Sequence, residues 1–139
     1  MDIQRVVQAY QELTKSNIAL LGHIYHSNVV FKDPVHKIEG WEALELYFES
    51  LYQNVISCSF DIHHAQQTEN QGFLVWTMRL QHPKLRRGQE ITVEGMSWLQ
   101  FSDHKVIVQQ DAYDLGEMIY EHIPLLGHVV RKVKQGLAQ

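Results

Sequence analysis

The hydrophobic residues of this chain change their spacing once, from a helical period to a strand period. In residues 3–55 they recur every three or four positions, as on one face of an amphipathic helix. From residue 58 to residue 113 they alternate with polar residues, as in strands with one buried face. Helices followed by such strands are typical of an α+β fold, in which helices cover one face of an antiparallel sheet.

The same patterns predict the individual elements. We expect three helices, the second of them capped by Ser16 or Asn17, within residues 3–13, 18–25 and 41–55. We expect four strands, around residues 58–62, 73–82, 91–101 and 105–113. A short helix follows from Leu115, Pro124 breaks it, and residues 125–138 form a basic amphipathic tail that includes Leu126.

Length and linker content indicate one domain. At 139 residues the chain has the size of a single hydrophobic core, and no low-complexity tract or linker divides it. We therefore expect one domain over residues 1–139, with residues 115–139 as a C-terminal helical extension. The tail has two interpretations, because its apolar stripe beside Arg131, Lys132 and Lys134 suits packing on this domain or a partner subunit, and also a membrane surface. We favour packing.

Composition argues against several classes of function. A formal charge of -4 is unlike the basic excess of nucleic-acid binders. No apolar run reaches the roughly 20 residues that span a bilayer, and the N-terminus has no signal-peptide pattern. The histidines and the single cysteine, Cys58, have no metal-ligand spacing, and no phosphate-binding glycine loop occurs, so we expect no metal and no cofactor. One cysteine also fits a reducing compartment, and we expect a cytoplasmic location.

The segment Phe31-Lys32-Asp33-Pro34-Val35 contains the first candidate site residue. Asp33 has two interpretations: a turn-forming residue, which the Asp-Pro dipeptide favours, or a general base in an apolar pocket. Burial in such a pocket disfavours the charged form of a carboxylate, which suits proton transfer near neutral pH.

Strand parity groups the other candidates. Trp76, Met78, Leu80 and His82 share one face of their strand, and Arg79 points to the other. Ser97 lies on a neighbouring strand, and Asp111 and Tyr113 share a face of the last strand. A curved sheet with helices across its concave side leaves a cone-shaped cavity that these side chains could line. Both faces carry apolar residues, so the sequence leaves open which face is inside.

The order of elements and the short motifs Val6-Val7-Gln8-Ala9-Tyr10, Phe31-Lys32-Asp33-Pro34-Val35 and Gly40 resemble the nuclear transport factor 2-like superfamily (a cystatin-like roll). The resemblance is strongest to its ketosteroid-isomerase and SnoaL-like branches. It implies that Asp33 is the proton-shuttling base and Tyr10 the oxyanion donor. Ser97 stands where ketosteroid isomerases have an acidic donor. Asp111 stands where SnoaL-like cyclases and limonene-epoxide-hydrolase-like members place a catalytic aspartate, but Arg79 points away from the arginine position of the hydrolases.

The resemblance and the residues support two hypotheses. The first is a cofactor-independent enzyme, isomerase- or cyclase-like with a lyase or hydrolase not excluded, that uses acid–base chemistry on a small apolar carbonyl compound. Its catalytic residues are Asp33, Tyr10 and Asp111, and His82 is a further proton carrier if it pairs with either aspartate. Its ligand-binding residues are Trp76, Met78, Leu80, His82, Ser97 and Tyr113. The second hypothesis is a non-catalytic module that binds a small ligand or a protein on the same fold. We expect a homodimer, because the superfamily commonly pairs through the second face of the sheet.

Overall fold

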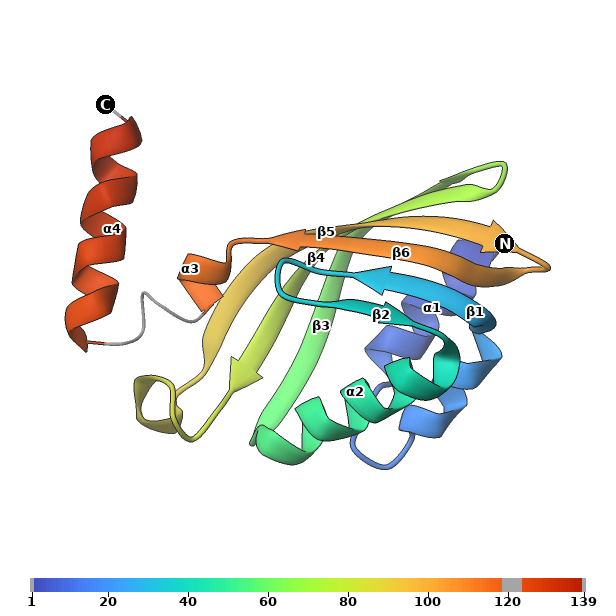
Figure 1. The fold of residues 1–139 in the computed structure, drawn as a ribbon, viewed down its shortest axis with the longest axis horizontal. Coiled ribbons are helices and arrows are strands. Elements are labelled where there is room, and N and C mark those ends of the chain that lie inside the picture. Colours follow the sequence, from blue (N-terminus) through green and yellow to red (C-terminus); the bar gives the residue numbers. More distant parts are fainter. Residues whose placement is uncertain (1, 119–123, 139) are drawn as a thin grey trace.

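The computed structural model describes residues 2–118 and 124–138, and its centre is a curved, unclosed sheet of six strands (Figure 1). The strands lie in the order β2-β1-β6-β5-β4-β3. Their bounds are β1 Tyr25–Lys32, β2 Lys37–Glu39, β3 Ser57–Thr68, β4 Gln71–Gln81, β5 Ile91–Ser102 and β6 Lys105–Tyr113. The helices are α1 Asp2–Gln11, η1 Ile18–His23 (3₁₀), α2 Trp41–Asn54, η2 Arg86–Gly88 (3₁₀), α3 Leu115–Met118 and α4 Pro124–Ala138. The α+β fold with helices over a curved sheet is therefore confirmed.

Helices α1 and α2 cover the concave side of the sheet because each has one apolar face. Helix α1 buries Ile3, Val6 and Tyr10, which lie three or four residues apart. Helix α2 buries Leu44, Phe48 and Tyr52 at the same spacing. Gly40 precedes α2 with a φ of 88°, a left-handed conformation that favours glycine. Both helices thus turn their apolar side chains toward the strands.

The second predicted helix is shorter than expected, and two strands were missed. Residues 18–23 form only a 3₁₀ turn, and Asn17 makes no capping hydrogen bond through its side chain. Tyr25 belongs to β1, which pairs with β6 in parallel, the one parallel pairing in this sheet. The apolar positions 18, 21 and 25 fit a helical spacing locally, but pairing with β6 and β2 extends the chain from Tyr25 onward.

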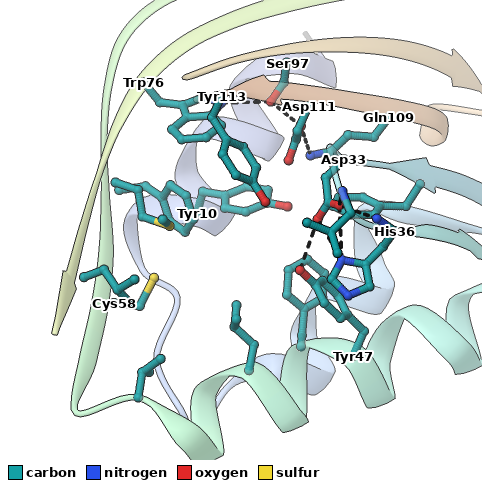
Figure 2. A pocket seen from close by; sticks show the side chains of 18 of the residues that line it. Tyr10, Asp33, His36, Tyr47, Cys58, Trp76, Ser97, Gln109, Asp111 and Tyr113 are labelled. Carbon is teal, nitrogen blue, oxygen red and sulfur yellow. Dashed lines mark hydrogen bonds and ion pairs between the residues drawn. The ribbon is translucent and has the colours of Figure 1, made fainter. Parts of the chain in front are cut away.

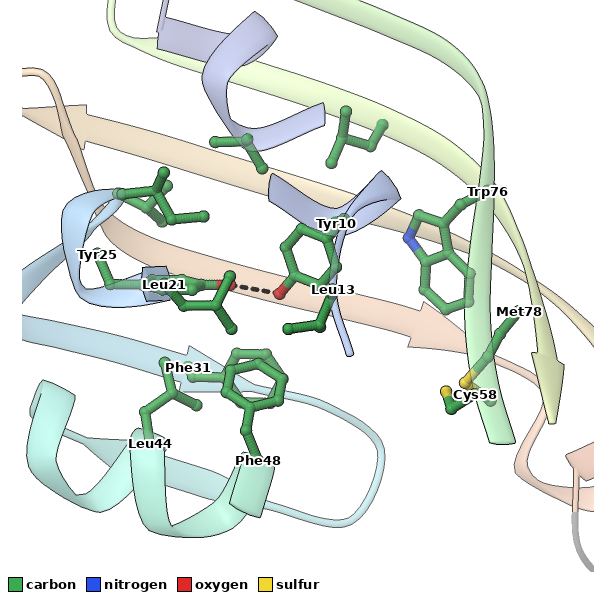
Figure 3. Packing of buried hydrophobic residues seen from close by; sticks show 14 of the residues in the cluster. Tyr10, Leu13, Leu21, Tyr25, Phe31, Leu44, Phe48, Cys58, Trp76 and Met78 are labelled. Carbon is green, nitrogen blue, oxygen red and sulfur yellow. Dashed lines mark hydrogen bonds between the residues drawn. The ribbon is translucent and has the colours of Figure 1, made fainter. Parts of the chain in front are cut away.

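The core lies between the sheet and the helices (Figure 3). Tyr25 is 1% exposed and stacks on Trp41, with ring centroids 5.7 Å apart. Phe31 and Phe48 pack edge to face 6.3 Å apart, so aromatic rings join β1 to α2. This packing fixes β1, and with it the turn that carries Asp33, against the helix.

Helix α4 stands apart from the sheet, beyond the end of β6 and α3 (Figure 1). It contacts the rest of the chain where Lys134 donates a hydrogen bond to Asp114 and where Val130 lies close to Gly116. Its residues Val129, Val133 and Leu137 are 50%, 57% and 82% exposed. The predicted tail is therefore helical, but this stripe does not pack on its own domain. The predicted Pro124 break involves residues 119–123, which lie outside the described residues, as does the side chain of Leu126. No helix in the described ranges is long and apolar enough to cross a membrane.

Candidate functional site

A cavity of about 550 Å³ lies between the concave face of the sheet and helices α1 and α2 (Figure 2). Its walls come from α1, α2, the turn after β1, and strands β3 to β6. The nine site residues that the sequence predicts all line this cavity: Tyr10, Asp33, Trp76, Met78, Leu80, His82, Ser97, Asp111 and Tyr113. The structure thus brings these residues together, and their roles stay predictions.

Strand register explains why the side chains from three strands meet. Leu74, Ser97 and Asp111 are direct neighbours across β4, β5 and β6, so their side chains share the concave face. Trp76 lies opposite Gly95. A Cβ atom at Gly95 would collide with the six-membered ring of Trp76, so the missing side chain lets the indole lie flat against β5. The sequence did not determine which face of the sheet is inside. In the structure it is the face that carries Trp76, Ser97 and Asp111.

A chain of hydrogen bonds runs across the buried end of the cavity to Asp111. The Tyr25 hydroxyl donates to Gln109 Oε1 at 2.6 Å. Because that bond uses the single hydroxyl proton of Tyr25, the Tyr10 hydroxyl is the donor in the short bond between the two tyrosines. Gln109 Nε2 in turn donates to Asp111 Oδ1 at 3.0 Å. The proton of Tyr10 is therefore committed to Tyr25 and is not directed into the cavity.

A second line of donors reaches the same oxygen of Asp111 from the sheet. Trp76 Nε1 donates to Ser97 Oγ at 2.9 Å, and Ser97 Oγ donates to Asp111 Oδ1 at 2.6 Å. Ser97 thus positions the carboxylate and has no proton left to donate to a ligand. Asp111 Oδ1 accepts two hydrogen bonds, whereas Oδ2 accepts none from a described residue. Oδ1 is therefore held in place, whereas Oδ2 is able to accept a proton or a hydrogen bond from a ligand.

Burial dominates the electrostatics of Asp111. It raises the pKa of Asp111 from 3.8 to about 6, against the opposing effect of the hydrogen bonds from Ser97 and Gln109, and the negative charge of Asp33 raises it further. A carboxyl group with a pKa near 6 changes protonation state close to neutral pH. Asp111 is therefore able to accept and return a proton under ordinary conditions.

Asp33 closes its own turn. Its Oδ1 accepts hydrogen bonds from the backbone N–H groups of Val35 at 2.8 Å and His36 at 2.7 Å. His36 Nδ1 lies 3.1 Å from the same oxygen, and the Tyr47 hydroxyl donates to Oδ2 at 3.2 Å. The side chain is 3% exposed. Asp33 therefore forms the turn and also lines the cavity, and its role as a base stays a prediction.

Tyr113 and His82 differ in what they offer a ligand. The Tyr113 hydroxyl points into the cavity in Figure 2 and forms no hydrogen bond with a described residue. Burial, and then the charges of Asp33 and Asp111, raise the pKa of Tyr113, so it stays a proton donor. His82 Nδ1 accepts the Lys84 N–H at 3.1 Å and makes no hydrogen bond with either aspartate. Of the two histidines that line the cavity, His36 is the one that contacts a site aspartate, namely Asp33.

Sequence reasoning missed four residues of the site: Tyr25, His36, Tyr47 and Gln109. Gln109 shares a strand face with Asp111, and His36 follows Asp33 by three residues, so both had a local signal. Tyr25 and Tyr47 had no local signal. Tyr25 bonds to Tyr10 and Gln109, which are distant in the sequence, and Tyr47 lies on α2, a helix that was expected only to contribute to the core. Arg79 lies on the outer face, where it pairs with Asp61 and Glu90. In the described parts of the chain, no group of His, Cys, Asp and Glu residues could hold a metal ion.

Solved structures of low sequence identity share this fold. An NTF2-like protein of unknown function from Burkholderia pseudomallei has a TM-score of 0.75 and 13% identity, over 85% of this chain and 94% of that one. An LEH-like epoxide hydrolase of M. tuberculosis has a TM-score of 0.73 and 14% identity, over 94% and 96%. A protein with a ketosteroid isomerase-like fold from Catenulispora acidiphila, in complex with trimethylamine, has a TM-score of 0.75 and 14% identity, over 86% and 92%.

These similarities establish the fold, and the family follows from the sequence itself. No curated protein matches this chain. The model of the SnoaL-like domain matches residues 6–109, which include part of α1, all of α2, the Asp33 turn, strands β1 to β5, and β6 as far as Gln109. The predicted resemblance is confirmed, and the chain belongs to the SnoaL-like domain family.

Proposed function

We propose that this protein is a cofactor-independent enzyme that moves a proton on a small, largely apolar carbonyl compound. Asp111 is the general base. The observation that carries this proposal is the asymmetry of this cavity-lining carboxylate: Oδ1 is held by Ser97 and Gln109, while Oδ2 accepts no hydrogen bond from a described residue. A base of this kind contributes roughly 10²–10⁴-fold to the rate.

The proposed reaction begins when Asp111 Oδ2 removes a proton from the carbon next to the carbonyl group. The electron pair moves onto the carbonyl oxygen, and the Tyr113 hydroxyl donates a hydrogen bond to the developing oxyanion. In a β,γ-unsaturated carbonyl compound, Asp111 then returns the same proton to the γ-carbon, the carbonyl double bond re-forms, and the carbon–carbon double bond moves into conjugation with it. The step is redox-neutral and needs no co-reactant, and it is isomerase-like. Asp33 and Tyr10 are positioning groups in this scheme, because their polar atoms are already engaged.

Proton removal can be tested without knowledge of the natural substrate. The protein is incubated in D₂O with small ketones such as cyclohexanone and 2-tetralone, and loss of the α-proton signals is followed by NMR. We expect exchange above the buffer rate, rising with pH through about 6 as Asp111 ionises. Asp111→Asn should lower it by about 10²-fold or more. Asp61→Asn is the matched control, because Asp61 pairs with Arg79 on the outer face.

The alternative is a non-catalytic ligand-binding module on the same fold. The commitment of the Tyr10 proton to Tyr25, and of the Ser97 proton to Asp111, favours it, since two of the expected donors do not face a ligand. Equal exchange by the wild type and by Asp111→Asn, together with ligand-induced shifts in the protein spectrum, would replace the enzymatic proposal with this one.

We also propose that the chain forms a homodimer through the outer face of its sheet. Phe73 and Met96 are 45% and 55% exposed there, on the adjacent strands β4 and β5. An exposed apolar patch of this kind is typical of an interface. Light scattering after size exclusion should give the mass of a dimer, and Met96→Glu should give a monomer with unchanged circular dichroism. A wild-type monomer would contradict the proposal.

A cytoplasmic location is the last part of the proposal. The one cysteine, Cys58, is a buried free thiol, which suits a reducing compartment. Fractionation of cells that express the full-length protein would test this.

A further inference from the structure

The charges that face the cavity are all of one sign. Asp33 and Asp111 are its acidic lining residues, and no described lining residue is a lysine or an arginine. Buried carboxylates are normally paired with a cation, because desolvation of an unpaired charge costs several kcal/mol. Among the described lining residues, only the histidines His36 and His82 are therefore able to supply a positive charge.

Apart from His36, the groups that donate hydrogen bonds to the two carboxylates carry no charge. Asp111 accepts from Ser97 and Gln109. Asp33 accepts from two backbone N–H groups and from the Tyr47 hydroxyl. His36 is the one lining side chain within ion-pair distance of either aspartate, and it becomes a cation only when protonated. These hydrogen bonds hold the carboxylates in place without neutralising them.

Other titratable groups in the cavity respond to this negative potential. Burial raises the pKa of Tyr47 most, and the charge of Asp33 adds to that shift. Asp33 and Asp111 both raise the pKa of Tyr113. The two tyrosines come from α2 and β6, so the potential extends across the space between these elements.

Aromatic rings make up much of the remaining wall. Phe60, Trp76 and Tyr113 line the cavity with their rings close together: Phe60 and Trp76 are 5.6 Å apart, and Trp76 and Tyr113 are 6.3 Å apart. Tyr47 lines it beside Asp33. The face of an aromatic ring attracts organic cations by about 0.5–2 kcal/mol. Such walls also accept an apolar body, which an inorganic cation would lack.

We propose that the ligand of this cavity is an organic cation, a protonated amine or quaternary ammonium group on an apolar body, whose charge is balanced by Asp33. The turn holds the Asp33 carboxylate in a fixed position, whereas Asp111 keeps its free oxygen for proton transfer. This inference concerns the charge of the ligand, and it holds for a catalytic cavity and for one that only binds. For the enzyme proposed above, it specifies an aminated carbonyl compound as the substrate class.

The test uses two compounds of the same shape that differ in charge. In (3-hydroxyphenyl)trimethylammonium a positive nitrogen stands where 3-tert-butylphenol has a carbon. Binding to the full-length protein is followed by NMR of ¹³C-methyl-labelled methionines. Met78 lines the cavity and reports binding there, whereas Met96 is 55% exposed on the outer face and serves as an internal control.

We expect the cation to bind at least about tenfold more tightly than its neutral counterpart, as a desolvated cation–π and ion-pair contact implies. Asp33→Asn should abolish most of that preference. It should also fold, because an asparagine Oδ1 can still accept the turn hydrogen bonds from residues 35 and 36. Asp61→Asn should leave the preference unchanged.

Equal or tighter binding of the neutral compound would overturn the inference, as would an undiminished preference in Asp33→Asn. Failure of the cation to shift Met78 would do the same. These outcomes are separate from those of the exchange experiment: deuterium exchange on neutral ketones without any cation preference would leave the proposed function intact and refute only the charge of the ligand.

Discussion

Replacement of Asp111 by asparagine should make the protein more stable at pH 8 but not at pH 4. The pKa of Asp111 is about 6 in the folded chain and 3.8 without its environment. At 1.36 kcal/mol for each pH unit of this difference, ionisation of Asp111 costs the folded state about 3 kcal/mol. The folded state binds the proton more tightly than the unfolded state between these values. The contribution of Asp111 to stability is therefore present below pH 4 and lost as pH rises through about 6.

Asparagine keeps the shape of the side chain and the acceptor for Ser97 and Gln109, but it carries no charge. Urea unfolding of both proteins, followed by circular dichroism from pH 4 to pH 8, measures the difference directly. We expect the two curves to agree within about 1 kcal/mol near pH 4. Near pH 8 the variant should be more stable by about 3 kcal/mol, with the change centred between pH 4 and pH 6.

Comparison of the two proteins at each pH cancels every contribution to stability that does not involve Asp111. Asp61→Asn controls for the loss of a carboxylate as such, and should change stability by no more than about 1 kcal/mol at pH 8. A difference between wild type and Asp111→Asn that stays flat from pH 4 to pH 8 would refute the desolvation of Asp111. The argument for a base with a pKa near 6 would then be lost as well.

Two further predictions concern the packing around the site. Tyr25→Phe should cost about 1–3 kcal/mol of unfolding free energy, because Tyr10 and Gln109 would each keep a buried polar group without a partner. Tyr52→Phe removes a buried hydroxyl whose polar neighbour among the described residues is the weakly hydrogen-bonding Cys58 thiol, and it should be close to neutral; a larger loss in Tyr52→Phe than in Tyr25→Phe would contradict this reasoning. Gly95→Ala should cost about 1–3 kcal/mol, because the new methyl group collides with Trp76, and a shifted indole ¹H–¹⁵N NMR signal should accompany the loss. An unchanged signal with full stability would show that the indole does not need this space.

The elements that sequence reasoning predicted well are those whose period is long and uninterrupted. Strand β6 begins and ends at the predicted residues 105 and 113, and α2 ends one residue before the predicted end at 55. Strand β1 was missed because Ile18, Leu21 and Tyr25 lie at helical spacing, and nothing local indicates that Tyr25 pairs with Val106. A parallel pairing between the first and last strands depends on contacts across 81 residues of chain, to which a local pattern is insensitive.

In the candidate site too, features with a local sequence pattern were predicted and features that depend on distant contacts were not. Alternation along the strands was enough to group Trp76, Met78 and Leu80, and to place Asp111 beside Tyr113. Alternation does not reveal which polar atoms are already paired. The Tyr10 proton is used by Tyr25, fifteen positions away, and the Ser97 proton by a strand neighbour. Residue type therefore suggested three donors or bases, whereas the hydrogen bonds among the described residues leave Asp111 Oδ2 and the Tyr113 hydroxyl able to exchange or donate a proton to a ligand.

Asp33 shows why the two interpretations of an Asp-Pro motif need not compete. The turn requires an acceptor oxygen at this position, and an asparagine would meet that requirement as well as an aspartate. The negative charge is therefore not explained by the turn. It also raises the pKa of Asp111, which an uncharged residue would not do. His36 balances the charge of Asp33 only when it is protonated, and a cationic ligand that enters the cavity is in a position to bring a counter-charge as well.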